Sequence, residues 1–416
     1  MERELLIEIG CEELPAAWLP KLTLEFACRL EVRLSEARIA IASPPEAFST
    51  PRRLVATVAK LSDRQGDVQE VVTGPPVAAA YNFEGAPTKA ATGFARKHGS
   101  EVSELIEVDT PKGRYLAYSR HQVGAASTEV LPAVLADTLR DLSFPKQMKW
   151  DATLDDGRGE LMFGRPIRWI LFLFGGQVVP FEIGRTTSAE SIDVAVIQSS
   201  NFTYGHRFLG ERAGEPVKVK SLADYQAKLA KRFVVLDHTE RRQKIQTALL
   251  AKAEEHGGSV DFASPTVSAL LNEVSDLVEC PLVVEGRFDE TFLKLPREVL
   301  TTTMMHHQHF FSLAGPEDGL LPVFLAVTNT VQENSERVSR NAERVVAARL
   351  RDARFFWEAD RKILLESRLN RLDTLLFHKR LGSYREKSVR IEKLAGWIVE
   401  KVFGRIDARA DTCMAA

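Results

Sequence analysis

The sequence predicts an α+β protein of several domains, with mixed or antiparallel sheets and packed helices, followed by the start of an all-helical part. Short runs of alternating apolar residues recur between residues 5 and 328, and helical repeats separate them. From residue 361 to residue 405 the apolar pattern is helical throughout. A chain of 416 residues is long enough for roughly two to four domains with substantial cores.

The composition is that of an ordinary soluble globular protein and excludes several classes. The net charge is −2, so any basic binding surface must be local. The four cysteines form no CxxC pair, which indicates neither a disulfide framework nor a zinc site. The longest apolar run, 167–175, is interrupted by Arg168 and is too short to span a membrane. We therefore expect a cytoplasmic protein without a membrane partner.

The N-terminal elements follow from their periodicity. A strand is predicted at 5–9, with one apolar face formed by the odd-numbered residues. A helix follows Pro15, with apolar residues four apart from Leu22 to Leu34. A second strand is predicted at 54–61, and the preceding Pro51 extends the chain so that Arg52 and Arg53 lie together at the start of this strand.

Later elements alternate between helix and strand. Thr88 can cap a short basic helix that Gly99 ends, and Gly175-Gly176 predicts a hairpin turn. The remaining helices are predicted to start at Ser127 and to span 221–233, 239–255 and 297–305; strands are predicted at 115–123, 170–174, 282–285 and 321–328.

The stretch 341–360 predicts a helix that connects the α+β part to the helical part. Val346 to Trp357 form one apolar stripe at helical spacing, and arginines lie on the other faces. Asn341 can cap its N-terminus. We expect the stripe to be buried, with Trp357 as its deepest anchor.

Two groups of residues are candidates for catalytic or metal chemistry. No Walker A, GxSxG or HExxH motif occurs. His306, His307 and His309 could ligate a metal, but no neighbouring Cys or carboxylate completes the set, so ordinary histidines are the commoner interpretation. Glu12-Glu13 could be an acid–base pair, although a polar strand end is commoner.

Basic residues point more clearly to a ligand. Pairs at strand edges or in adjoining loops would hold a guanidinium on a rigid base, which suits phosphate binding: Arg52-Arg53, Arg165 with Arg168, and His206-Arg207. A structural salt bridge is the alternative for each pair. Between 361 and 405, twelve Lys and Arg face five Asp and Glu, which fits either a solvated face or a nucleic-acid surface.

Several motifs in a fixed order give the sequence a resemblance to a known family. They are LLIEIGCEELPA at 5–16, STPRRL at 49–54, PTKAATGFARKHG at 87–99, FGRPIRWI at 163–170, GHRF at 205–208, LPREVLTTTMMHHQHFF at 295–311, NAERVVAARLRDARFFWEAD at 341–360 and HKRLGS at 378–383. In these stretches the chain resembles the β subunit of bacterial glycine–tRNA ligase.

The resemblance implies a function in attaching glycine to tRNA(Gly). It implies two α and two β chains, with the class II catalytic core, glycine, ATP and Mg on the α subunit. This chain would then carry no catalytic residue, metal or cofactor, would not bind DNA, and would hold tRNA. The tRNA contacts are expected from the basic pairs named above and from the connecting helix, and therefore from Arg52, Arg53, Arg165, Arg168, His206, Arg207, Arg344 and Arg351.

The resemblance also implies a domain division. We expect α+β regions at 1–205 and 206–335, a connecting helix at 336–366 and the truncated start of an HD-type domain at 367–416. Only His378 follows residue 360 and no His-Asp dipeptide occurs, so the HD label would describe shape and not catalysis. Two other functions stay open: a metal-dependent hydrolase or editing domain that uses the three histidines, or a purely structural docking scaffold.

Overall fold

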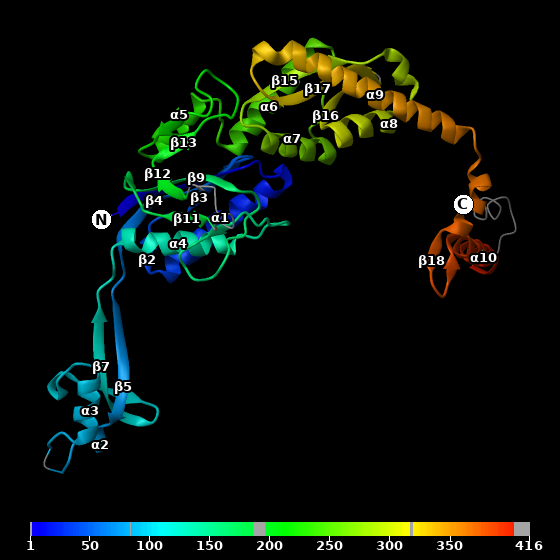
Figure 1. Cartoon of the computed structure of the whole chain (residues 1–416). Helices are drawn as coiled ribbons and strands as arrows, with labels where there is room; N and C mark the ends of the chain where they lie inside the picture. The colour runs from blue at the N-terminus through cyan, green and yellow to red at the C-terminus, as the bar shows by residue number, and fades with distance from the viewer. Residues whose placement is uncertain (1, 84, 186–195, 317–318, 403–416) are drawn as a thin grey trace, which may run out of the picture. The chain divides into compact units, whose positions relative to one another are not determined.

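The computed structural model describes residues 2–83, 85–185, 196–316 and 319–402 (Figure 1). The chain divides into two compact units. The first unit comprises Met1–Glu254, Asp261–Val284 and Val327–Ser335; the second comprises Glu255–Val260, Glu285–Ala326 and Glu336–Ala416. Both units contain helices and strands, so the predicted α+β class is confirmed.

A nine-stranded sheet forms the centre of the first unit. Its order is β2-β4-β1-β9-β12-β11-β8, with β3 paired to β4 and β10 paired to β9. β1 lies between β4 and β9 and is antiparallel to both. The strands are β1 (Glu2–Cys11), β2 (Ile39–Ile41), β3 (Glu46–Thr50), β4 (Arg53–Gln65), β8 (Ala152–Thr153), β9 (Ile167–Phe174), β10 (Gln177–Val178), β11 (Glu182–Arg185) and β12 (Ile197–Ser200).

Both faces of this sheet are buried. Helices α1 (Leu19–Glu36) and α4 (Ser127–Asp141) supply a core with the odd-numbered side chains of β1. On the opposite face, Leu6 packs in a second core with side chains of α5 (Leu222–Ala230). The predicted helices α1, α4 and α5 are confirmed. The prediction that β1 has a single apolar face is wrong, because a central strand covered on both sides has no solvent face.

A smaller sheet carries the predicted basic helix. Its strands, in the order β5-β7-β6, are β5 (Val68–Pro76), β6 (Ile106–Thr110) and β7 (Gly113–Gln122), and α2 (Val77–Ala80) and α3 (Lys89–Lys97) complete this appendage. Ala80, Ala91 and Leu116 form its core. Thr88 precedes α3 as predicted, but its hydroxyl donates to the Ala79 carbonyl and does not cap the helix.

The rest of the first unit contains β13 (Phe202–Tyr204), β14 (Pro216–Lys218), α6 (His238–Glu255) and α7 (Pro265–Leu277). The helix α7 was not predicted from the sequence. Ser264-Pro265 is a good helix start, and Leu271 and Val274 are buried. A three-stranded sheet follows in the order β15-β17-β16, from β15 (Pro281–Arg287), β16 (Phe310–Ala314) and β17 (Leu320–Asn329). The helix α8 (Arg297–Thr301) precedes β16.

The long helix α9 (Ser335–Arg361) starts before residue 341, which is the start predicted from the apolar pattern. Asn341 therefore lies inside the helix and cannot be its N-cap. Val346 and Leu350 are fully buried as predicted, whereas Trp357 is only half-buried beneath the guanidinium of Arg361, so the deepest anchor was wrongly assigned.

The segment after α9 is not helical throughout, which corrects that prediction. It contains a 3-10 stretch at Leu365–Thr374, the short hairpin of β18 (Leu376–His378) and β19 (Gly382–Ser383), and α10 (Tyr384–Val402). Gly382 has a φ of +80°, which allows the hairpin between the two helical parts. These elements do not establish an HD-type domain. No helix in the described part of the chain has the length and apolarity to cross a membrane.

Candidate functional site

The guanidinium of Arg53 is the centre of a buried charge network. Arg53 begins β4, and its Nη1 donates to Oε1 of Glu8 at 2.9 Å while its Nη2 donates to Oε1 of Glu279 at 3.1 Å. Neither Arg53 nor Glu8 has any exposed surface. Burial opposes the charge on Arg53, but the two carboxylates outweigh it and raise the pKa of the guanidinium. The same burial raises the pKa of Glu8.

Arg52 and Arg53 do not share a face, because successive side chains of an extended chain point to opposite sides. Arg53 also donates to Thr203 and to the Tyr204 carbonyl. A phosphate cannot reach a guanidinium that is enclosed in this way. This burial contradicts the expectation that Arg53 contacts RNA. Its guanidinium has a structural role in the fold.

A chain of ion pairs joins three of the predicted segments at the solvent. Nη2 of Arg168, on β9, lies 2.7 Å from Oε1 of Glu12, and Nη1 of Arg207 lies 3.1 Å from the other oxygen of Glu12. Arg207 is also 2.9 Å from Glu13. Burial acts against ionisation of Glu13, but the hydrogen bond from Arg207 lowers its pKa below the usual range. The carboxylates of Glu12 and Glu13 thus neutralise the charges of Arg168 and Arg207, two of the predicted RNA contacts.

Arg52 and His206 lie beside this chain of ion pairs and are less accessible. Nη1 of Arg52 donates to the Gly205 carbonyl at 3.4 Å, and its guanidinium carbon lies 5.4 Å from the ring centre of Trp169. Burial lowers the pKa of both Arg52 and His206. His206 is only 4% exposed, so a charged contact between its ring and RNA is disfavoured.

An exposed aromatic ring accompanies Arg207. Phe208 is 77% exposed, and the Arg207 guanidinium carbon lies 5.4 Å from its ring centre. Sequence reasoning singled out His206-Arg207 and passed over this phenylalanine. The GHRF loop therefore presents one arginine and one aromatic ring to solvent while its histidine is buried.

The other predicted arginines lie elsewhere. Arg165 stacks over Trp18 at 5.5 Å and donates to the Gly164 carbonyl at 2.9 Å. Arg344 and Arg351 lie on α9 in the second unit and are exposed. Neither has an ion-pair partner in the described part of the chain. The predicted residues therefore lie in three places, with Arg53 buried beneath the first. This first place is a cluster of Arg52, Arg168, His206 and Arg207. Arg165 stacks separately on Trp18, and Arg344 and Arg351 lie on the surface of α9.

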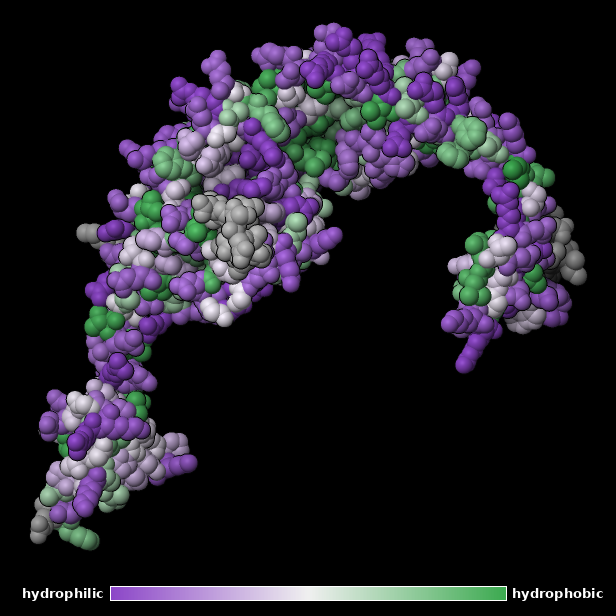
Figure 2. Space-filling view, in the orientation of Figure 1, coloured by the Kyte–Doolittle hydropathy of each residue, from purple (hydrophilic) through white to green (hydrophobic). Residues whose placement is uncertain are grey.

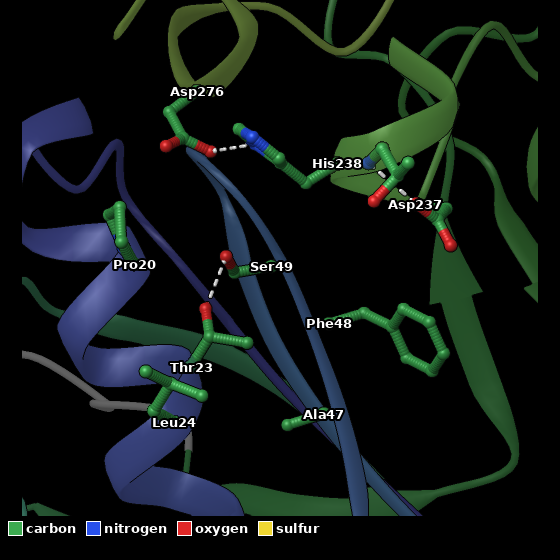
Figure 3. Close-up of a pocket in the computed structure, with 10 residues that line it drawn as sticks. Pro20, Thr23, Leu24, Ala47, Phe48, Ser49, Asp237, His238 and Asp276 are labelled. Carbon is green, nitrogen blue, oxygen red and sulfur yellow. Dashed lines mark hydrogen bonds and ion pairs between the residues drawn. The ribbon is translucent and has the colours of Figure 1, made fainter. Parts of the chain in front are cut away.

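A pocket of about 360 Å³ in the first unit was missed by sequence reasoning (Figure 3). Nδ1 of His238, at the start of α6, lies 2.9 Å from Oδ1 of Asp276 on α7. The hydroxyls of Thr23 and Ser49 lie 2.6 Å apart on the opposite wall (Figure 3). No hydrogen bond among the described residues joins His238 to either hydroxyl, so the dyad does not activate a nucleophile in this geometry.

The histidines at 306, 307 and 309 do not lie on a strand. A π-helical turn spans Thr302–His306, His307 follows it, and His309 has a φ of +57° just before β16. Within the described ranges no group of three or more His, Cys, Asp or Glu side chains is placed to hold a metal. The shared strand face that motivated the metal hypothesis is therefore absent.

The fold and these surfaces define a multi-part α+β protein that exposes guanidinium groups on separate elements. Comparison with known proteins identifies its family. The model of the glycyl-tRNA synthetase beta subunit family matches residues 5–416. The chain belongs to this family.

Individual relatives agree with the family match. The glycine–tRNA ligase beta subunit of Syntrophus aciditrophicus is 39% identical over 402 residues, which is 97% of this chain and 55% of that protein. The corresponding protein of Solidesulfovibrio magneticus is 42% identical over 397 residues, 95% of this chain and 53% of the relative. That of Geobacter sp. is 38% identical over 419 residues, 100% of this chain and 57% of the relative. The chain spans about half the length of the curated relatives it matches.

Proposed function

We propose that this chain is the tRNA-binding and structural partner of a catalytic α subunit in ATP-dependent attachment of glycine to tRNA(Gly). The observation that carries this proposal is the family match over residues 5–416, together with relatives that are named glycine–tRNA ligase beta subunit. Glycine activation, with ATP and Mg, belongs to the α subunit in this proposal, and two α chains assemble with two β chains in the cytoplasm.

Helix α9 offers an RNA-binding surface. Arg337, Arg344 and Arg351 are seven residues apart and therefore share one side of the helix. Arg344 lies two residues from the buried Val346, about 200° around the helix axis, so this arginine row faces away from the core. The three arginines are exposed, and none has a carboxylate partner among the described residues. Figure 2 shows strongly hydrophilic side chains along α9.

The arginine row suits a phosphate backbone better than a base edge. Its ends are fourteen residues apart, which corresponds to about 21 Å along the helix axis. Unpaired guanidiniums over that length can contact several phosphates of one backbone, and such contacts are independent of base identity. We therefore assign α9 a positioning role in tRNA binding, without sequence readout.

The test of the RNA-binding role uses a matched arginine on the same helix. Replacing Arg344 with Gln should weaken binding of a tRNA(Gly) transcript and lower the slope of log K against log salt by about 0.8. Arg349→Gln removes one exposed charge from another side of α9, about 140° from Arg344, and should change binding less. A filter-binding titration from low to moderate salt measures both. Equal effects of the two substitutions would contradict the proposed surface.

The test of the ligase role uses reconstitution. The purified chain alone should support neither glycine-dependent pyrophosphate exchange nor tRNA charging, whereas a mixture with the α subunit of a relative should form glycyl-tRNA. Exchange by the chain alone would overturn the division of labour. Absence of any tRNA binding would favour the docking scaffold.

A further inference from the structure

Gly93 is a mid-helix glycine that the fold does not require. It lies within α3, whose Ala91 and Ala95 are buried, while Gly93 is on the exposed side. Its backbone is not in the left-handed region, and a Cβ built there would meet nothing within 4 Å. Glycine weakens a helix relative to alanine because it retains more freedom in the unfolded chain. Neither packing nor backbone geometry within the described appendage explains this residue.

Three cations surround this glycine on the helix surface. Lys89 is four residues before Gly93, and Arg96 and Lys97 follow it by three and four residues, which are the spacings of surface neighbours. All three are exposed, and none has an ion-pair partner in the part of the appendage that the structure describes. Arg96 and Lys97 lie in the last turn of α3, where cations interact favourably with the helix dipole. Gly93 therefore reduces helix stability at the centre of an exposed basic face.

We propose that this face of α3 binds an RNA sugar–phosphate backbone, which approaches the helix most closely at Gly93. The absence of a side chain there allows a phosphate group to come near the helix surface, and Lys89 and Arg96 neutralise it from either side. The proposal rests on the proposed function, since it names a second element through which the chain holds tRNA.

The composition of the face favours RNA over a protein partner. Apart from the cations it presents Ala90, Thr92 and Gly93, all exposed and small. Protein interfaces usually depend on large apolar or aromatic anchors, and this face has none. A polyanionic backbone needs only cations and close approach. Charge and shape therefore both match a nucleic-acid backbone.

The experiment separates close approach from charge. Gly93→Ala and Gly93→Gln in the full chain should each raise the thermal midpoint, because both residues form helices better than glycine. Both should weaken binding of a tRNA(Gly) transcript, roughly threefold for alanine and roughly tenfold for glutamine, as the side chain holds the backbone away. Opposite changes in stability and affinity exclude misfolding as the cause. Fluorescence anisotropy and circular dichroism provide the two measurements.

A charge series uses the same appendage. Lys89→Gln with Arg96→Gln should lower the salt slope of tRNA binding by about 1.5, since two phosphate contacts are lost. Lys112→Gln removes an equivalent exposed charge from the turn between β6 and β7 and should leave the slope nearly unchanged.

The outcomes distinguish the inference from the proposed function. If the unmodified chain binds tRNA and the Gly93 variants bind equally well, the inference is overturned and the proposed function stands. If the unmodified chain binds no tRNA, the proposed function is overturned, and the inference that rests on it is overturned with it. If the variants lose α-subunit binding but keep tRNA binding, α3 contacts a protein and the inference is also overturned.

Discussion

Replacing Arg53 with methionine should destabilise the first unit by about 3–5 kcal/mol. The substitution removes donors to two carboxylates, those of Glu8 and Glu279, whose side chains are 0% and 2% exposed. Methionine fills much of the volume but leaves both acids buried without their cation. Breaking a buried pair on one side costs far more than the pair contributes in net stability, because the remaining charge cannot be solvated.

The pH dependence of this loss tests its electrostatic origin. Burial raises the pKa of Glu8 above the ordinary 4.5, so the folded state favours its protonated form. A raised acid pKa stabilises the fold fully below the unfolded value, and this contribution is lost as pH rises through the folded value. The charge of Arg53 opposes this rise, so its removal raises the pKa of Glu8 further, and the Arg53→Met variant should lose less stability at pH 5 than at pH 8. Urea unfolding followed by tryptophan fluorescence is suitable, because Trp169 lies 5.7 Å from the Arg53 guanidinium.

Two comparison variants make the measurement decisive. Arg168→Met breaks an exposed ion pair with Glu12 and should cost about 1 kcal/mol or less. Adding Glu8→Gln and Glu279→Gln to Arg53→Met removes the orphaned charges and should restore part of the loss. A cost for Arg53→Met as small as that for Arg168→Met would refute the buried-charge reasoning, as would an equal loss at both pH values.

Three further predictions concern packing and protonation. Gly10→Ala should cost about 1–3 kcal/mol and alter tryptophan emission, because its Cβ would lie 1.9 Å from Cε2 of Trp169. Burial lowers the pKa of His206. The stability that its neutral ring contributes is therefore complete above the ordinary pKa of 6.5 and is lost as pH falls below that value. The substitution His206→Gln should reduce this pH dependence of the urea midpoint. Leu350→Ala should cost about 2–4 kcal/mol in thermal or urea unfolding, whereas the half-exposed Val345→Ala should cost under about 1 kcal/mol.

The elements that sequence reasoning predicted best are those whose signal is local. The helices α1 and α4 repeat apolar residues at helical spacing, and the predicted apolar row of α1 from Leu22 to Leu34 is buried. The second buried face of β1 was missed because its cover comes from α5, more than two hundred residues later in the chain. The sequence around residue 6 therefore does not show that a distant helix covers this face of β1.

The candidate site was predicted in composition but not in accessibility. One member or more of each basic pair does come together at the start of β9 and in the GHRF loop, whereas Arg165 stacks separately on Trp18. Which arginine is buried depends on Glu279, which is 226 residues from Arg53 in the sequence. The His238–Asp276 pair is likewise formed by two helices, one of which was not predicted. Pairing across such distances is fixed by tertiary packing, and a single sequence does not encode it visibly.

In the proposed tRNA-binding role, carboxylate partners decide which cations are available to RNA in a chain with a net charge of −2. Arg168 and Arg207 already contact Glu12 and Glu13, so a phosphate that binds them must replace an existing ion pair and gains little. The unpaired cations of α3 and α9 give up only water and counterions, whose release favours binding. The salt dependence of tRNA binding should therefore respond more to substitutions on α3 and α9 than to substitutions in the Glu12–Glu13 cluster, although the cluster was the stronger signal in the sequence.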